Sequence, residues 1–473
     1  MTTGIWWIRR DLRLDDNPAL QEAITHSDHL IPLFILDPTI LSHPAEKRKS
    51  FLFDGLRALD ASLRRQGSQL IVRQGEPQQV IAEVFETSGA SAVYAEADYS
   101  PYARKRDHAV AARFPLWLVH GLTVFPPGLI QKSTGAPYTV YTYFNRAWKN
   151  LPVPAPCCNV DEFRMPPLPA KIPTSQAIPA ATAHHLALQA GEQAAFAQLQ
   201  HFLAGPISRY GQDRDLLAAD ATSMLAPYLR FGMLSIRGLV AEARYLMENA
   251  ADETTRQNAA LWLDQFIWRD FYFSILHYFP QVLKTSFRRD LHNIQWRHAP
   301  ADLEAWKQGQ TGYPVVDAGM RQLRQTGWIH TRARVITASF LVKDLLINWQ
   351  DGEAWFMEQM LDGDPALNNG GWQRAAGVGT DAVPFFRIFN PTQQGRKFDP
   401  AGEYIRRWVP ELARVPDKFI HQPWLMPAEV QQLAGCVVGV NYPKPIVDHR
   451  QIKERTLQAY HTGQKYQVLS SRG

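Results

Sequence analysis

Cysteine is scarce in this 473-residue chain, and long apolar segments are absent. The three cysteines, Cys157, Cys158 and Cys436, are too few for a disulfide framework or for a zinc site built from cysteine. A membrane-spanning helix would need a run of about 18 apolar residues, which the sequence lacks, and the N-terminus does not have the pattern of a signal peptide. We therefore expect a reduced, cytoplasmic protein without membrane attachment.

Several common catalytic motifs are missing as well. The sequence contains no P-loop, no H-E-x-x-H pair of metal-binding histidines and no nucleophile elbow. No G-x-G-x-x-G segment follows the first predicted strand, so a dinucleotide-binding Rossmann half is not indicated.

The composition is that of a globular protein with a small excess of positive charge. Hydrophobic residues make up 45% of the chain and charged residues 20%, which excludes wholesale disorder. Lysine and arginine number 50 against 45 acidic residues, and 36 of the 50 are arginine. Because arginine binds phosphate through a planar pair of N–H groups, this surplus permits a polyanionic partner. The 14 tryptophans are unusually many and need either a very large core or a specific role.

Strands and helices alternate in the first 130 residues. Short apolar runs at residues 4–8, 29–36, 69–73, 92–95 and 116–119 are separated by segments with helical periodicity, which predicts a parallel sheet covered on both faces. Eight prolines then fall within residues 151–180 and favour an extended connector, because proline removes a backbone donor. From residue 191 onward the pattern is helical. We therefore predict a Rossmann-like α/β domain at 1–130, a Pro-rich linker at 131–190 and an all-α domain at 191–473.

The most polar segment of the predicted helical domain is L-D-G-D-P-A-L-N-N-G-G-W-Q-R at residues 361–374. Its aspartates, asparagines and glycines are poor formers of both helix and core. One interpretation is a capped loop between helices, and the other is a backbone that bends around a polar ligand.

A set of motifs in a fixed order resembles one known family. They are R-R-D-L-R-L at 9–14 with Asn17, T-S at 222–223, W-R-D-F at 268–271, G-Y-P at 312–314, G-W-I-H at 327–330, the segment 362–373, R-I-F-N-P at 387–391, K-F-D at 397–399 and N-Y-P at 441–443. Together they resemble the photolyase/cryptochrome flavoproteins over the whole chain. The resemblance is greatest to the microbial (class I) enzymes that repair cyclobutane pyrimidine dimers.

The resemblance implies that the helical domain binds FAD. The positions that match the FAD-binding residues of the family are Tyr210, Thr222, Ser223, Met224, Leu225, Ala226, Trp262, Arg269, Arg334, Asp362, Asp364 and Asn368. Ala226 stands where the family usually has serine, so one hydroxyl contact is lost. Arg334 is expected to pair with Asp362, and Asn368 matches the residue beside the flavin N5.

Three tryptophans match the electron-transfer chain of the family. Trp372 would lie next to the flavin, Trp349 in the middle and Trp296 at the surface. Any one of them alone would be read as core packing, but all three occur in register with the other motifs. The N-terminal domain would carry an antenna chromophore, and Asp98 with Pro101-Tyr102 resembles the deazaflavin-binding subgroup more than the folate-binding one. An empty antenna site is the alternative.

The positions that would contact the lesion depart from the pattern of the dimer-repairing enzymes. Gln265 replaces a glutamate, Thr331 an asparagine and Val335 a methionine, and Arg374 replaces the second tryptophan of the usual W-Q-W. The dimer would lie between that position and Trp268. The His-His pair of the six-four enzymes is absent too. Cations that match phosphate contacts remain at Arg332, Arg387 and Lys397.

The resemblance implies a blue-light-driven, FAD-dependent lyase that acts as a monomer on pyrimidine dimers in DNA. An electron from the reduced flavin would split the dimer and return, and Gln265 and Asn368 would place hydrogen bonds where charge accumulates. The main alternative is a cryptochrome-type photoreceptor, and the altered lesion pocket favours this alternative. A flavoprotein that binds DNA without acting on it is a third interpretation. The retained DNA-facing cations, and a chain that stops at residue 473, soon after a helix predicted at residues 452–460, favour repair.

Overall fold

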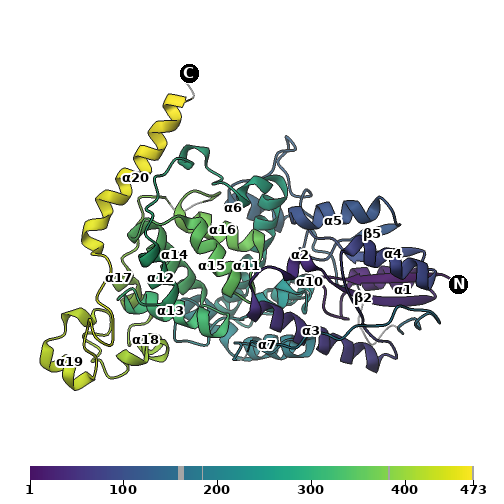
Figure 1. Cartoon of the computed structure of the whole chain (residues 1–473), viewed down its shortest axis with the longest axis horizontal. Helices are drawn as coiled ribbons and strands as arrows, with labels where there is room; N and C mark the ends of the chain where they lie inside the picture. Colours follow the sequence, from purple (N-terminus) through teal and green to yellow (C-terminus); the bar gives the residue numbers. More distant parts are fainter. Residues whose placement is uncertain (158–163, 184, 382–383, 471–473) are drawn as a thin grey trace.

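The computed structural model describes residues 1–157, 164–183, 185–381 and 384–470. Cys158, one of the cysteines considered above, lies outside these residues. The N-terminal part forms an α/β unit and the C-terminal part is helical, and the two lie side by side along the long axis of the molecule (Figure 1). The predicted fold class is confirmed.

Five parallel strands form one sheet in the order β3-β2-β1-β4-β5. The strands are β1 (Thr3–Ile8), β2 (His29–Leu36), β3 (Ile71–Gln74), β4 (Ala92–Glu96) and β5 (Leu116–Val119). The apolar run predicted at residues 29–36 is β2, and all of its residues but the first are buried. A strand covered on both faces needs apolar side chains on both, which explains its continuous pattern.

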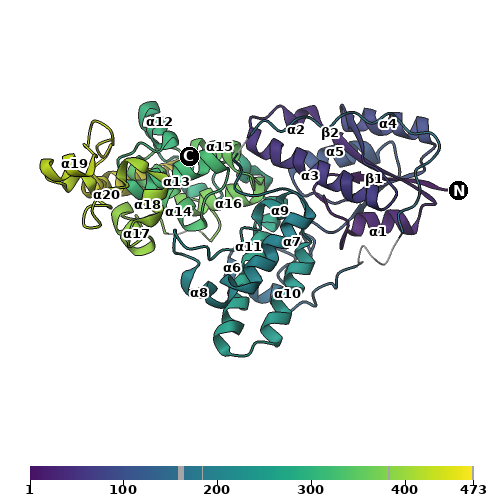
Figure 2. The same cartoon turned by 90° about the horizontal axis from the view of Figure 1, so that it is seen from below.

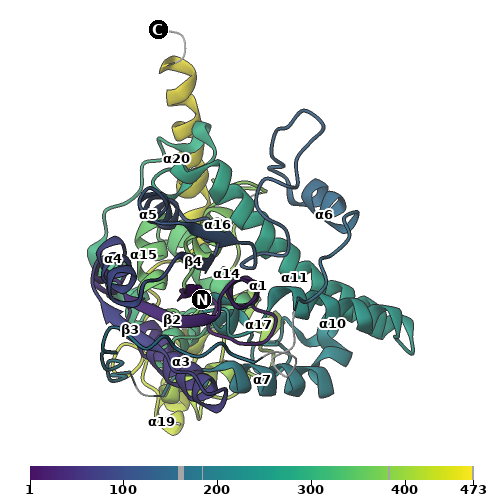
Figure 3. The same cartoon turned by 90° about the vertical axis from the view of Figure 1, so that its right-hand side faces the viewer.

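Helices surround the sheet (Figure 3). They are α1 (Pro18–Thr25), α2 (Pro38–Leu41), α3 (Glu46–Arg65), α4 (Pro77–Ser88) and α5 (Pro101–Ala111). Alternate side chains of β1 enter different cores, as the strand geometry requires: Ile5 and Trp7 pack with α4 and α5. Trp6 and Ile8 instead share a core with α1, α3 and helices of the C-terminal part. Continuous apolar packing therefore joins one face of the sheet to the helical part.

The segment predicted as a linker, residues 131–190, contains the helix α6 (Tyr141–Lys149) and no other helix or strand among its described residues. Its Pro-rich portion lies along β3, where Val72 N donates to Ser175 Oγ and Gln176 N donates to Val72 O. The domain boundaries at residues 130 and 190 stay a prediction.

The helical part begins with a group of helices that lies below the sheet in Figure 2. These are α7 (Glu192–Ala204), α8 (Tyr210–Asp213), α9 (Ala226–Arg230), α10 (Ile236–Glu248) and α11 (Glu253–Tyr278). The remaining helices are α12 (Pro300–Gln308), α13 (Pro314–Thr326), α14 (Thr331–Ser339), α15 (Trp349–Gln359), α16 (Pro365–Ala376), α17 (Pro391–Phe398), α18 (Glu403–Trp408), α19 (Ala428–Ala434) and α20 (His449–Ser470).

Short helical turns connect these helices. They are η2 (Pro206–Arg209), η3 (Pro280–Leu283), η4 (Arg289–Leu291), η6 (Pro410–Leu412) and η7 (Pro423–Leu425), with one π-helical turn, η5 (Phe340–Asp344). Among the described helices, none is both long enough and apolar enough to span a membrane.

The two parts of the chain meet at a turn that only glycine can form. Gly232 has a φ of +61°, and a Cβ atom added there would lie 1.8 Å from the carbonyl oxygen of Arg10. Around this turn, Leu12 N donates to Phe231 O at 3.0 Å and Arg13 Nη1 donates to Gly232 O at 3.1 Å. The segment after β1 is thereby fixed against the start of α10.

Candidate functional site

The polar segment at residues 361–374 is a turn followed by α16. Asp364 caps the helix, because its Oδ1 accepts hydrogen bonds from Ala366 N at 2.8 Å and Leu367 N at 3.4 Å. The helix then buries the side chains of Asn368, Asn369, Trp372 and Gln373. The helix cap of the first interpretation is present. A capped loop alone does not explain the buried amide side chains, which are the feature expected of a segment that binds a polar ligand.

Arginines from distant parts of the chain surround Asp364. Arg10, directly after β1, places Nη2 at 2.6 Å from Asp364 Oδ2 and Nη1 at 3.3 Å from Asp98 Oδ2. Burial alone would raise the pKa of Asp364, but the fields of Arg10, Arg230 and Arg269 outweigh burial and lower that pKa below its usual value. Asp364 is therefore a buried carboxylate held ionised by guanidinium groups.

Arg334 pairs with Asp362, as the resemblance implied. Arg334 lies on α14, and its Nη2 is 2.9 Å from Asp362 Oδ2. Arg334 Nε also donates to Ile329 O at 3.1 Å, which fixes the orientation of the guanidinium. The pair leaves about a quarter of the arginine side chain exposed.

Tyr210 and Trp262 both pack against Phe202. The ring centroids of Phe202 are 5.7 Å from Tyr210 and 5.2 Å from Trp262. The indole Nε1–H of Trp262 is buried and has no hydrogen-bond partner among the described residues. A buried donor without a partner is unfavourable by about 1–3 kcal/mol, so an acceptor from a bound ligand would stabilise this position.

The turn at residues 222–225 precedes the short helix α9. Thr222, Ser223 and Met224 are half-buried, and Leu225 is buried. Met224 has a φ of +52°, an unfavourable conformation for a residue with a side chain. Ala226, where a serine was expected from the resemblance, begins α9 and is exposed.

Asn368 belongs to a polar network between α15 and α16. Its Nδ2 donates to Glu353 O at 2.9 Å, and the neighbouring Asn369 Nδ2 donates to Glu353 Oε1 at 3.1 Å. Gln373 Nε2 in turn donates to Asn369 Oδ1 at 3.0 Å. Burial raises the pKa of Glu353 to about 7, and the hydrogen bond from Asn369 opposes the rise.

The three tryptophans of the predicted electron path differ in burial. Trp372 and Trp349 are buried, with 3% and 2% of their surface exposed, whereas Trp296 is only partly buried. Trp372 packs on Gly352, one turn after Trp349, where an added Cβ would lie 2.2 Å from the indole. Trp372 also contacts Trp306 at a centroid distance of 6.0 Å, so indole contacts alone do not select one path.

Arg332, Arg387 and Lys397 line a single cavity of about 460 Å³. Leu216, Phe389 and Phe398 form its apolar lining. The guanidinium of Arg332 lies 4.4 Å from the ring centre of Phe398 and is paired with Asp215 at 2.6 Å. The structure thus brings together the cations that the sequence assigned to DNA phosphates, although they come from α14, α17 and the segment before α17.

The residues predicted to contact the lesion lie on α11, α14 and α16, and Arg374 has a described contact with the Trp268 ring of α11. Arg374 on α16 places its guanidinium carbon 4.6 Å from the ring centre of Trp268. Gln265 is exposed one turn earlier on α11, and its Nε2 donates to Leu261 O of the same helix at 3.1 Å. On α14, Thr331 is exposed and Val335 half-buried, and no described contact joins these two side chains to Trp268.

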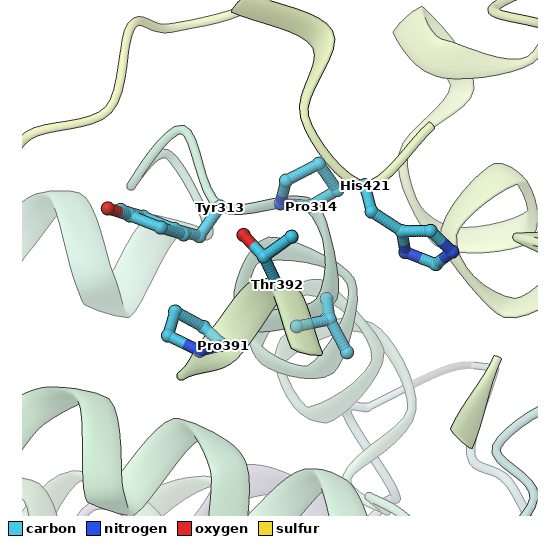
Figure 4. A pocket seen from close by; sticks show the side chains of 6 residues that line it. Tyr313, Pro314, Pro391, Thr392 and His421 are labelled. Atoms are coloured by element: carbon cyan, nitrogen blue, oxygen red, sulfur yellow. The ribbon is translucent and has the colours of Figure 1, made fainter. Parts of the chain in front are cut away.

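A second hollow lies where α13 and α17 meet. Tyr313, Pro314, Pro391, Thr392 and His421 surround it (Figure 4). None of them belongs to the predicted site residues, and Gly395 packs closely against the His421 ring there, with an added Cβ 2.9 Å from Nδ1. This hollow is a packing feature between helices.

Comparison with known proteins identifies the family. A model of DNA photolyase matches residues 4–160, and a model of the FAD binding domain of DNA photolyase matches residues 262–462. A deoxyribodipyrimidine photo-lyase from Halobacterium salinarum is 40% identical over 96% of this chain and 98% of its own length. The chain belongs to the photolyase/cryptochrome family.

Solved structures agree with this assignment. The structure of a bacterial class III photolyase from Agrobacterium tumefaciens has a TM-score of 0.93 at 35% identity and covers 98% of each chain. A cryptochrome from Synechocystis sp. has a TM-score of 0.88 at 30% identity, over 97% of this chain and 99% of its own. The subclass within the family stays a prediction.

The described residues fit FAD as the cofactor of this domain. The buried N–H of Trp262 has no partner among the described residues, so a hydrogen-bond donor is free for an acceptor atom of the cofactor. The roles of the individual site residues stay predictions. Sequence reasoning missed the contacts of Arg10, Arg230 and Glu353, because they join segments that no local motif connects.

We expect Asp364→Ala to weaken FAD retention. The variant leaves Arg10 buried without its closest partner, which typically lowers stability by about 3–5 kcal/mol. FAD affinity, measured by fluorescence of released flavin during dilution, should fall at least about tenfold. Asp54→Ala, which removes only the surface pair with Arg57, should retain FAD like the parent. Equal retention in both variants would contradict the placement of the flavin.

Glu353 should make stability pH-dependent. Its pKa is about 7 in the folded chain and about 4.3 when unfolded, so the folded state binds more protons in between. The free energy of unfolding should therefore fall by about 3 kcal/mol from Glu353 alone as the pH rises from about 4 to 8. Glu353→Gln should lack this contribution, which urea unfolding of both proteins at several pH values can measure. Identical pH profiles would show that Glu353 titrates normally.

Proposed function

We propose that this protein is a deoxyribodipyrimidine photo-lyase that splits cyclobutane pyrimidine dimers in DNA under blue light. The observation that carries the proposal is the cavity in which Arg332, Arg387 and Lys397 meet two phenylalanines. A basic cavity with aromatic lining supplies both the phosphate contacts and the stacking surfaces that an extruded nucleotide needs. The family relatives named above support the same reaction.

The residues of this chain would divide the work between cofactor and lesion. FAD, when bound and reduced, supplies the electron for the reaction after absorbing light. Asp362 with Arg334 and Asp364 with Arg10 would hold the cofactor through fixed charges. Asn368 would offer an amide beside the flavin N5, held in place by its hydrogen bond to Glu353 O.

At the lesion, Trp268 would supply the stacking surface and Gln265 a hydrogen bond to the dimer. The Gln265 amide now donates to its own helix and is exposed, so it reaches a ligand by rotation about its side-chain bonds. Thr331 and Val335 would form the neighbouring wall on α14. Arg332, Arg387 and Lys397 would bind the phosphates on either side.

Lesion recognition can be tested by measuring the affinity of the protein for DNA in the dark. A repair enzyme should bind an oligonucleotide with one cyclobutane dimer more tightly than the same undamaged strand, because only an unstacked lesion reaches Trp268. Equal affinity for both would favour the second candidate function.

The second candidate is a photoreceptor of the cryptochrome type. The observation that favours it is the contact between Arg374 and Trp268, which occupies the expected lesion pocket. Similarity to a cryptochrome structure fits this candidate as well. A receptor would retain the tryptophan path and would not need lesion-selective binding.

We propose that the N-terminal domain also has an antenna site. Asp98 and Tyr102, beyond the end of β4, would take part in an antenna site, with deazaflavin favoured over folate. Tyr102 donates a hydrogen bond to Asp37 and Asp98 pairs with Arg10, so both side chains are fixed at this edge of the sheet. The protein would act as a monomer in the cytoplasm, with domains at 1–130 and 191–473.

Photoreduction of the bound flavin should depend on Trp372. Trp372→Phe keeps an apolar ring of similar size in the buried position but replaces indole by a ring that is much harder to oxidise. With an external reductant present, loss of the oxidised-flavin absorbance under blue light should stop in Trp372→Phe and continue in the parent. Trp306→Phe serves as the matched control, since Trp306 contacts Trp372 without belonging to the proposed path. Photoreduction that is unchanged in Trp372→Phe would remove the tryptophan chain from the mechanism.

DNA affinity should depend on salt through Arg387. On duplex DNA each phosphate contact contributes about −0.9 to the slope of log affinity against log salt. The slope measured for Arg387→Ala should therefore be smaller in magnitude by about one. Arg64→Ala, which removes an exposed arginine of α3, should keep the slope of the parent. An unchanged slope in Arg387→Ala would show that this residue does not contact phosphate.

A further inference from the structure

Both faces of the Trp268 indole are covered. The ring of Tyr141, from α6, stacks on it at a centroid distance of 3.6 Å with an interplanar angle of 6°. The guanidinium carbon of Arg374 lies 4.6 Å from the ring centre. Because Tyr141 fills one face at van der Waals distance, Arg374 must lie over the other. A base can stack on Trp268 only after one of these covers moves.

The two covers differ in how firmly they are held. Tyr141 Oη donates to Asp264 O at 3.0 Å and accepts from Asn145 Nδ2 at 2.8 Å. The Arg374 side chain is exposed, and among the residues that the structure describes its contact is the one with the Trp268 ring, without an ion pair or a side-chain hydrogen bond. An exposed cation–π contact contributes only about 0.5–1 kcal/mol. Arg374 is therefore the cover that an entering base displaces.

The charges near Trp268 leave Arg374 available for an anion. Asp264 is paired with Lys149 at 2.7 Å, so its charge is already compensated. Burial raises the pKa of Tyr272 to about 12. The charge of Arg374 lowers this pKa and that of Asp381 raises it, so both charges lie near the Tyr272 ring. Asp381 does not approach Arg374 within ion-pair distance in the structure. Gln265 and Arg374, the departures from the family motif noted above, both make this pocket more positive.

We propose that Arg374 determines which ligands reach Trp268. In the free protein it covers the stacking face, and when a lesion enters, its guanidinium moves to the phosphate that links the two damaged pyrimidines. The planar fork of arginine matches the oxygens of one phosphate, and its long stem spans the thickness of a stacked base. Moving Arg374 away from Trp268 costs free energy. Only a nucleotide pair that supplies both a base to stack on Trp268 and a linking phosphate to bind Arg374 offsets this cost. This inference rests on the proposed repair function.

The test uses single-stranded oligonucleotides with one cyclobutane thymine dimer. In one the linkage within the dimer is the natural phosphate, in the second it is a neutral methylphosphonate, and a third strand is undamaged. Their affinities are measured in the dark for the parent and for Arg374→Ala at one salt concentration. Retained FAD and an unchanged thermal transition establish that the variant is folded.

A reversal of preference is expected. With the phosphate linkage the parent should bind about tenfold more tightly than Arg374→Ala, the usual size of a charged hydrogen bond. With the neutral linkage the variant should bind about two- to fivefold more tightly than the parent, because no cover has to be displaced. Arg387→Ala, which does not touch Trp268, should lose affinity for both strands alike.

The outcomes separate this inference from the proposed function. The parent could prefer the lesion strand while the change of linkage alters the affinity of the parent and of Arg374→Ala by the same factor. In that case the role proposed for Arg374 is contradicted and the repair function stands. If the parent does not distinguish the natural lesion strand from the undamaged one, the repair function itself is contradicted. Arg374→Lys gives a second check, since it keeps the charge without the planar group and should show a smaller reversal.

Discussion

The buried ion pair between Arg10 and Asp364 is the contact on which the arrangement of the site depends. Arg10 follows the first strand of the sheet, and Asp364 caps the helix that carries Asn368 and Trp372. A charge pair at this depth is favourable only when each partner has further contacts. Asp98 on the side of the sheet, and Arg230 and Arg269 on the helical side, provide them.

This pair connects the two parts of the chain at the place where the cofactor is proposed to bind. Gly232 allows the turn before α10 to close on the backbone of Arg10, and the apolar core continues from the sheet into α11. The sheet therefore acts as a rigid support for the cofactor-binding helices. Outward from there, the fold places the cavity lined by Arg332, Arg387 and Lys397, and the partly buried Trp296.

The fold could be read from the sequence to a large extent, because its signals are local. The apolar run 29–36 is a strand because both of its faces are buried, and Asn17 marks a helix start through its side-chain cap. Helix α6 was not predicted, since proline-rich sequence nearby suggested an extended connector. Its Tyr141 stacks on Trp268, a contact over more than a hundred residues that no periodicity indicates.

The site was predictable where a motif names a residue, and not where a partner comes from elsewhere. The pairing of Arg334 with Asp362 was expected from the resemblance, and the structure contains it. The partners of Asp364 were not, because a buried charge does not reveal which arginine will reach it. The resemblance placed position 374 across the lesion pocket from Trp268, but the direct contact of the Arg374 guanidinium with the indole emerged only from the structure, since an arginine on a helix is ordinarily a solvated charge.

The central claim is that this chain repairs cyclobutane dimers in light. Its most direct test is to incubate the purified flavin-containing protein with an oligonucleotide that holds one defined cyclobutane thymine dimer, and separately with one that holds a six-four lesion, in blue light and in darkness. Light-dependent restoration of the two thymines is expected for the cyclobutane lesion alone. Binding of that lesion with FAD present, but without repair in the light, would contradict the claim.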